Sequence, residues 1–137
     1  MRRVGGHPHA MQILKQCLAV GLAGALGALA RFLVGNACKY LFETSFPVGT
    51  LLINLSGSFI LGLFLGLAGE RMAVGETMRL AVAVGFVGAY TTFSTFMYET
   101  NALLESGQVY KAVTNLIVSV VVGLALVRLG AICARHI

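Results

Sequence analysis

Long apolar runs, separated by short clusters of charged residues, dominate this sequence. Residues 16–30, 44–69, 80–98 and 112–127 carry no charge, and the first and last runs continue past a single arginine to residues 37 and 134. A bilayer span needs about 20 mostly apolar residues. Because the runs show no period-two alternation, they predict helices rather than membrane strands. We expect four transmembrane helices, over about 16–38, 48–68, 80–98 and 112–134.

The composition is typical of a chain that lies almost wholly in a membrane. Hydrophobic residues make up 58% and charged residues 11% of the sequence, whereas soluble domains carry about 25% charged residues. Four spans use about 80 residues, which leaves only short connections. We therefore expect a single transmembrane domain over residues 1–137, an all-α integral membrane protein.

The net charge of +5 does not indicate a nucleic acid partner. The basic residues lie scattered between the apolar runs and form no stripe with interleaved aromatic residues. They are typical of helix ends near lipid headgroups. Of the ten, only Arg31, Lys39 and Lys111 fall on the side opposite the termini. This imbalance favours a cytoplasmic location for both termini.

No catalytic constellation is visible. The five acidic residues are expected at helix ends or in loops, and the histidines lie near the termini. Neither a nucleophile–base pair nor a metal-ligand spacing appears, so we expect no enzyme. The acidic residues are Glu43, Glu70, Glu76, Glu99 and Glu105.

The second expected helix carries a face of polar and small residues. Thr50, Asn54, Ser58, Gly62 and Gly66 follow one another at intervals of four, so they share one side of a helix. Glycines allow the close approach of another helix in lipid. An asparagine amide near mid-membrane is costly unless it finds a partner. Asn54 therefore either bonds to a neighbouring helix or lines a solute pathway.

The fourth expected helix repeats this spacing with Asn115, Ser119 and Gly123. Two helices with matching polar faces can line a shared polar track, or they can simply bind each other. Mutual binding alone would saturate their hydrogen-bonding groups, whereas a pathway leaves some donors free. The sequence leaves both interpretations open.

The third expected helix contains the most informative segment. Gly85 and Gly88 precede the pair Thr91 and Thr92, and both residue types lower helix propensity. A break within 88–92 would free backbone carbonyls and amides at membrane depth, which is tolerated only beside protein or a polar cavity. Free carbonyls suit a small cation, and free amides suit an anion.

Two phenylalanines follow this segment. Phe93 and Phe96 lie three residues apart and share a helix face, with the hydroxyls of Ser94 and Thr95 between them. Such a pair commonly packs against lipid or protein. The alternative interpretation uses the positive edge of each ring, which can contact an anion without trapping it.

Three stretches resemble the signatures of the Fluc/CrcB family of fluoride channels. They are GALARF at 27–32, FPVGTLLIN at 46–54 and GAYTTFSTF at 88–96, and the resemblance extends over about residues 18–130. It implies passive export of fluoride, which relieves fluoride toxicity, by an antiparallel, dual-topology homodimer in a bacterial inner or plasma membrane. Dual topology needs nearly balanced loop charges, which conflicts with the charge imbalance described above.

The resemblance also implies roles for individual residues. Backbone carbonyls of Gly88 and Thr91 match positions that hold a structural sodium ion at the dimer interface. Arg31 matches an arginine that we expect to extend to the membrane surface rather than line the pore. Asn115 departs from the family pattern, since many members have tyrosine there, and Gly123 stands where some have a hydroxyl. The expected fluoride-contacting set is Thr50, Asn54, Phe93, Ser94, Phe96, Asn115 and Ser119.

Two other functions compete with a fluoride channel. A small proton-coupled multidrug exporter also has four helices, but it needs a titratable carboxylate inside the membrane. The four expected helices contain none. A structural or assembly subunit would use its asparagines and glycines only to hold helices together. A fluoride-efflux assay distinguishes the three.

Overall fold

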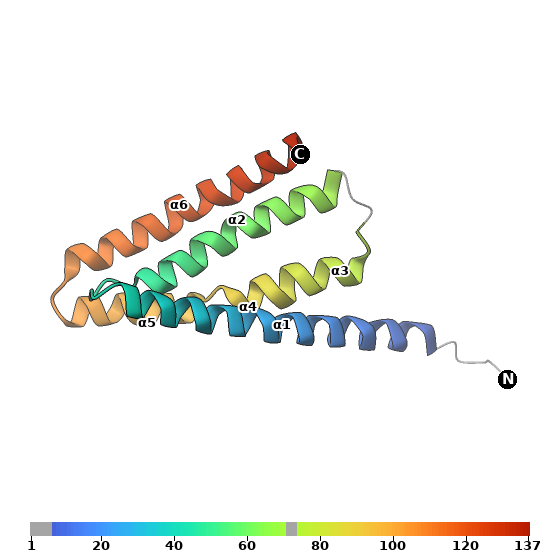
Figure 1. Ribbon diagram of the computed structural model, residues 1–137, viewed down its shortest axis with the longest axis horizontal. Helices are drawn as coiled ribbons and strands as arrows, with labels where there is room; N and C mark the ends of the chain where they lie inside the picture. Colours follow the sequence, from blue (N-terminus) through green and yellow to red (C-terminus); the bar gives the residue numbers. More distant parts are fainter. Residues whose placement is uncertain (1–6, 71–73) are drawn as a thin grey trace.

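The computed structural model describes residues 7–70 and 74–137, which are helical almost throughout and contain no strand (Figure 1). Four helical segments are long and apolar enough to cross a membrane, as the sequence predicts. Arg2, Arg3 and Arg71, which contribute to the charge imbalance, lie outside the described residues. The spans are His9–Leu41, Val48–Gly69, Glu76–Glu105 and Val109–His136.

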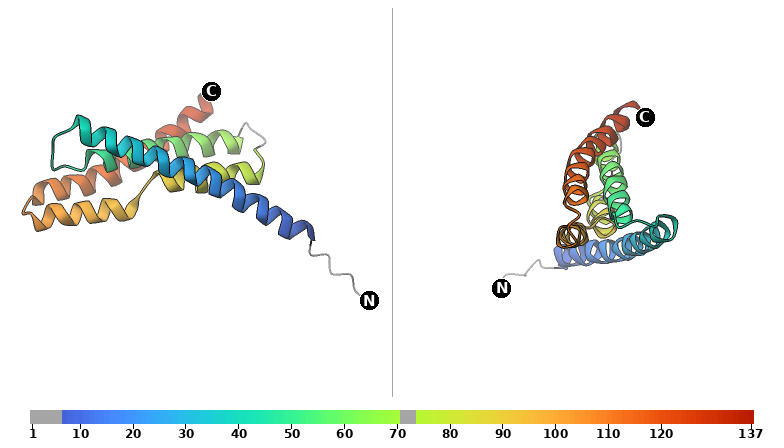
Figure 2. Two further views of the ribbon diagram at one scale, coloured as in Figure 1. Left: turned by 60° about the horizontal axis from the view of Figure 1, so that its bottom comes forward. Right: turned by 90° about the vertical axis from the view of Figure 1, so that its left-hand side faces the viewer.

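The first helix, α1 (His7–Leu41), has 35 residues and is longer than the expected range of 16–38. At about 1.5 Å per residue it exceeds the ~30 Å hydrocarbon layer by some 20 Å, and its N-terminal end extends beyond the other helices (Figure 2). Helix α2 (Val48–Glu70) begins directly after Pro47, which suits the first turn of a helix because it needs no N–H partner.

The third span is divided, as the glycines and threonines predict. Helix α4 (Gly88–Tyr90) is short, and Thr91 and Thr92 adopt extended backbone with ψ of 159° and 118° before α5 (Phe93–Glu105) begins. A π-helical segment precedes α4, whereas the sequence predicts a regular helix there. The segments in order are α3 (Glu76–Leu80), η1 (Ala81–Val87), α4 (Gly88–Tyr90) and α5 (Phe93–Glu105).

This span also continues to Glu105, beyond the expected end at residue 98. The expectation that all acidic residues lie at helix ends or in loops is therefore wrong for Glu99, which lies within α5. A charged residue does not end a helix when the following turns still pack against a neighbouring helix, as those of α5 do against α6.

Glycines bring the helices into close contact. Helix α6 (Val109–His136) lies along α2, and a methyl group added at Gly62 would collide with the Val127 carbonyl. A methyl group at Gly27 of α1 would collide in the same way with the backbone of Phe86 in η1. The bundle thus combines an α2–α6 pair with a pair formed by α1 and the first half of the third span. The start of α1 and the end of α6 lie at the same end of the bundle (Figure 1).

Candidate functional site

Asn54 of α2 holds the break in the third span. Its Nδ2 donates to the carbonyl oxygen of Thr92 at 3.0 Å, and its Oδ1 accepts from the Thr92 N–H at 2.8 Å. One amide thus satisfies both backbone groups of a residue in extended conformation. Nδ2 carries two hydrogens, so this pairing leaves one for another acceptor.

The break also deprives two carbonyl oxygens of their helical donors. In a continuous helix the N–H of Thr92 would bond to Gly88 and that of Thr95 to Thr91. The Thr92 N–H bonds to Asn54 instead, and the Thr95 N–H donates to Thr92 Oγ1 at 3.3 Å. The two carbonyls expected to bind sodium are therefore those that lose these donors.

Helix α5 begins inside the membrane. Thr92 is its N-cap, since the Thr92 hydroxyl oxygen accepts from the Thr95 N–H. The first turn of a helix presents unpaired N–H groups and the positive end of the helix dipole. The start of α5 therefore favours negative charge.

Two cavities meet at this point, and Thr92 lines both. The smaller, of about 310 Å³, lies between α2, the break and α6. It brings together four residues of the expected set and the neighbouring Ser58. These five residues are Asn54, Ser58, Phe93, Phe96 and Ser119.

The two phenylalanine rings differ in exposure. The centroids of Phe93 and Phe96 lie 6.0 Å apart, and the rings make an angle of 60°, an edge-to-face pair. Phe96 is buried, whereas Phe93 is 74% exposed. Phe93 thus faces whatever surrounds this chain in the membrane, next to the cavity that it lines.

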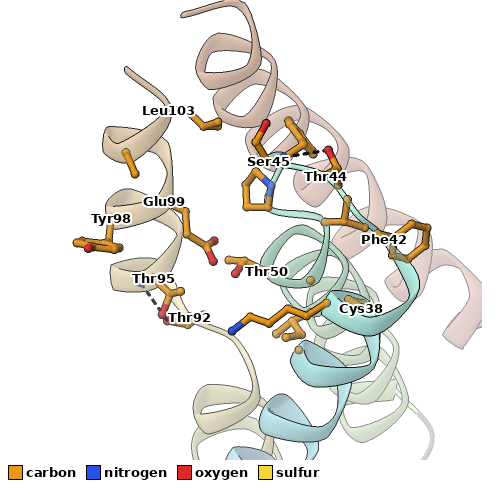
Figure 3. A pocket seen from close by; sticks show the side chains of 18 of the residues that line it. Cys38, Phe42, Thr44, Ser45, Thr50, Thr92, Thr95, Tyr98, Glu99 and Leu103 are labelled. Carbon is orange, nitrogen blue, oxygen red and sulfur yellow. Dashed lines mark hydrogen bonds between the residues drawn. The ribbon is translucent and has the colours of Figure 1, made fainter. Parts of the chain in front are cut away.

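The larger cavity, of about 560 Å³, opens on the other side of Thr92. Thr50 of the expected set lines it and is buried. The Glu99 carboxylate points into this cavity towards Thr50 (Figure 3). Arg31 and Lys39 contribute the cationic part of its wall.

Arg31 does not extend to the membrane surface, so that expectation is wrong. The side chain is half-buried, lines the larger cavity, and donates from Nη1 to the Thr91 carbonyl oxygen at 3.4 Å. The break provides an unpaired carbonyl at a distance that the long arginine side chain can reach. Hydrophobicity alone could not reveal this partner, which lies 60 residues away in the sequence.

Sequence reasoning missed three other residues that line the larger cavity: Thr92, Thr95 and Glu99. They lie three and four residues apart, so they share one face of α5. This spacing was visible in the sequence. Only Glu99 lies beyond the expected helix end at residue 98, and without it the shared face is not apparent.

Two residues of the expected set lie outside both cavities. Ser94 is exposed at the start of α5. Asn115 is 1% exposed, and its Nδ2 donates to Thr100 Oγ1 at 2.8 Å. The structure thus brings Asn115 to a partner on α5 rather than to a cavity wall.

The polar faces of α2 and α6 do not saturate each other. Ser119 Oγ is buried and has no hydrogen-bond partner among the described residues, although Ser119 lines the smaller cavity. A free buried donor is what a pathway leaves available, whereas mutual helix binding would have used it. Asn115 Oδ1 and Glu99 Oε2 are likewise buried and have no partner within residues 7–70 and 74–137.

The chain is a helical membrane protein with four candidate spans, and two cavities share Thr92 at the break in the third span. Amide, hydroxyl and phenylalanine side chains line the smaller cavity, an architecture typical of a membrane transport protein. The comparison with known families agrees. The chain belongs to the family described as CrcB-like protein, Camphor Resistance (CrcB), whose model matches residues 18–131.

Similar proteins include several named "Fluoride-specific ion channel FluC". The chain is 50% identical to the one from Methylococcus capsulatus over 119 residues, 87% of this chain and 52% of that protein. It is 42% identical to the one from Citrifermentans bemidjiense over 122 residues, 89% of this chain and 98% of that protein. The chain thus spans about half of the first relative and nearly all of the second.

Proposed function

We propose that this protein is a fluoride-selective channel through which fluoride leaves the cytoplasm passively. The observation that carries the proposal is the set of uncharged groups around the break. They are the second Nδ2 hydrogen of Asn54, the hydroxyl of Ser119 and the two phenylalanines, Phe93 and Phe96, that line the same cavity. The relatives named as fluoride-specific channels support the same function.

The chemistry of fluoride explains why such groups are suitable. A small, strongly hydrated anion gives up its water only to groups that donate hydrogen bonds or present positive edges. Conduction also requires release, which a buried lysine or arginine at the narrow point would hinder. Arg31 and Lys39 line the larger cavity together with Glu99. The smaller cavity, which holds Asn54 and the two rings, is lined by uncharged residues.

A second copy of the chain completes the pathway in this proposal. Phe93 is 74% exposed, and Gly88 and Ser94 beside it are exposed as well. An antiparallel homodimer would cover these residues and place Ser94 beside the ion path. The dimer lies in a bacterial inner or plasma membrane and inserts in both orientations.

Efflux from liposomes tests the function. Purified protein should release fluoride from loaded liposomes without a proton or sodium gradient, and should release chloride far more slowly. Ion-selective electrodes measure both rates on the same preparation. Equal fluoride and chloride rates, or fluoride release that requires a proton gradient, would contradict the channel.

Glu99 favours one second candidate. A proton-coupled multidrug exporter needs a carboxylate inside the membrane, and the expected helices contain none. In the structure, however, Glu99 lies within the third span and lines the larger cavity. Proton-coupled transport would stop when the proton gradient is collapsed. It would also be lost in Glu99→Gln, even with a gradient present. Channel conduction is driven by the fluoride gradient and depends on neither a proton gradient nor a proton carried by Glu99.

We further propose a structural sodium ion at the dimer interface, held by the carbonyl oxygens of Gly88 and Thr91 from each subunit. The loss of their helical donors supports this site, because free carbonyl oxygens are ligands that sodium accepts. A carbonyl oxygen has two lone pairs, so the long contact from Arg31 to Thr91 leaves one available.

Exchange of sodium for a large organic cation should lower the thermal stability of the dimer, and re-addition of sodium should restore it. Light scattering and thermal unfolding in detergent measure both effects without reference to flux. Potassium serves as the control for ionic strength. A melting temperature that is the same in all three salts, with no ion at the break in an experimental structure, would remove this site.

A further inference from the structure

A chain of two buried hydrogen bonds connects α6 to the ring pair. Asn115 Nδ2 donates to Thr100 Oγ1 at 2.8 Å, and Thr100 Oγ1 donates to the carbonyl oxygen of Phe96 at 2.7 Å. Asn115 and Thr100 are 1% and 4% exposed. The ring of Phe96 lines the smaller cavity and meets Phe93 edge to face.

The direction of this chain follows from its groups. A hydroxyl has one hydrogen, and Thr100 uses it on the Phe96 carbonyl, so its oxygen can only accept from Asn115. The amide of Asn115 is therefore held with Nδ2 towards α5. Its Oδ1 remains buried without a partner among the described residues.

Burial of an amide with one group unpaired destabilises the folded protein, because that group loses its bonds to water. A leucine of similar size would pack between α5 and α6 without that cost. Packing alone therefore does not explain an asparagine here. The amide adds a directed hydrogen bond to Thr100. The Thr100 hydroxyl in turn donates to the backbone of Phe96, whose side chain lines the smaller cavity.

We infer that Asn115 is a positioning residue: it acts on the ion pathway through Thr100 rather than by contact with fluoride. A threonine bond to the carbonyl four residues earlier bends a helix locally, and here that carbonyl belongs to Phe96. Asn115 fixes the orientation of the Thr100 hydroxyl. That hydroxyl sets the tilt of the first turns of α5, which carry the rings of Phe93 and Phe96. This inference rests on the proposed fluoride function.

Four variants test it: Thr100→Val, Thr100→Ser, Asn115→Leu and the double variant with valine and leucine. We expect Thr100→Val and Asn115→Leu each to lower fluoride flux about tenfold, since each removes a bond that sets the pathway. The fluoride-to-chloride ratio should fall too, while dimers remain intact. Thr100→Ser should recover most of the loss, and the double variant should be no slower than the slower single variant.

Gly66→Ala is the control for packing. A methyl group there meets Ala134 on α6, so it strains the bundle away from this chain of bonds. It should lower thermal stability and leave the fluoride-to-chloride ratio unchanged. If Thr100→Val does not yield dimers, Asn115→Leu and Thr100→Ser still give the comparison.

The outcomes separate the two proposals. Wild-type protein that carries no fluoride overturns the proposed function and this inference with it. Wild-type protein that carries fluoride, with variants of unchanged flux and ratio, overturns the positioning role alone. Flux that falls only in proportion to dimer yield, at a constant ratio, shows that Asn115 and Thr100 merely hold helices together.

Discussion

Asn54→Asp is expected to lower fluoride flux by about 100-fold. Two effects combine, each of roughly 1.4 kcal/mol or a factor of ten. The carboxylate cannot donate to the Thr92 carbonyl, so an anionic oxygen faces a carbonyl oxygen at the break. The same negative charge repels an anion in the smaller cavity that Asn54 lines. Efflux from fluoride-loaded liposomes measures the loss.

Asn101→Asp is a matched control for this substitution. Asn101 is exposed on α5, where its Nδ2 donates to Glu105 at 2.8 Å. The same change in charge there should leave flux near the wild-type value. Gel filtration of every sample shows whether the proposed dimer forms and persists. Intact Asn54→Asp dimers with wild-type flux would show that Asn54 does not line the path, and loss of dimers in parallel with flux would favour a purely structural amide.

Phe96→Ile should lower fluoride flux about tenfold, and Phe93→Ile should do so to a similar extent. Isoleucine keeps an apolar side chain but lacks the positive ring edge, and one weak ion–ring contact of about 1.4 kcal/mol corresponds to a factor of ten. Either substitution also removes the edge-to-face pair of the two rings. Fluoride and chloride efflux, measured on the same liposomes, give both rate and selectivity.

Phe86→Ile controls for the loss of an aromatic pair as such. Phe86 stacks on Tyr90 with ring centroids 6.1 Å apart, outside the residues that line either cavity. Its substitution should affect thermal stability more than the fluoride-to-chloride ratio. A Phe96→Ile protein with unchanged rate and ratio would remove the rings from the pathway and leave them a packing role.

Local features of the sequence were sufficient for the spans and for the break. A run of apolar residues partitions into lipid whatever its neighbours are, so the four spans follow from composition and length. Gly88, Thr91 and Thr92 weaken a helix through their own backbone and side-chain preferences, and the helix ends at Tyr90. The spacing of four that places Gly62 on one face likewise needs only helix geometry, and Gly62 does meet α6.

The partners of the polar groups could not be read from local features. Asn54 had two possible roles by sequence. Packing gives it a bonded partner, Thr92, 38 residues away, and also places it on a cavity wall, while its role in a solute pathway stays a prediction. Arg31 reaches the Thr91 carbonyl only because α1 lies against the break. Each of these bonds depends on which helices are neighbours.

Helix ends and the exact faces of α5 and α6 were also decided by tertiary contacts. Charge at Glu99 suggested the end of a span, but α5 continues to Glu105 because it packs against α6. Asn115 and Ser119 share a face by spacing, yet of the two only Ser119 lines one of the two cavities. The Asn115 amide is instead bonded to the Thr100 hydroxyl of α5. Hydropathy and propensity act within a few residues along the chain, whereas the partner of a buried amide is set by the helix that packing brings beside it.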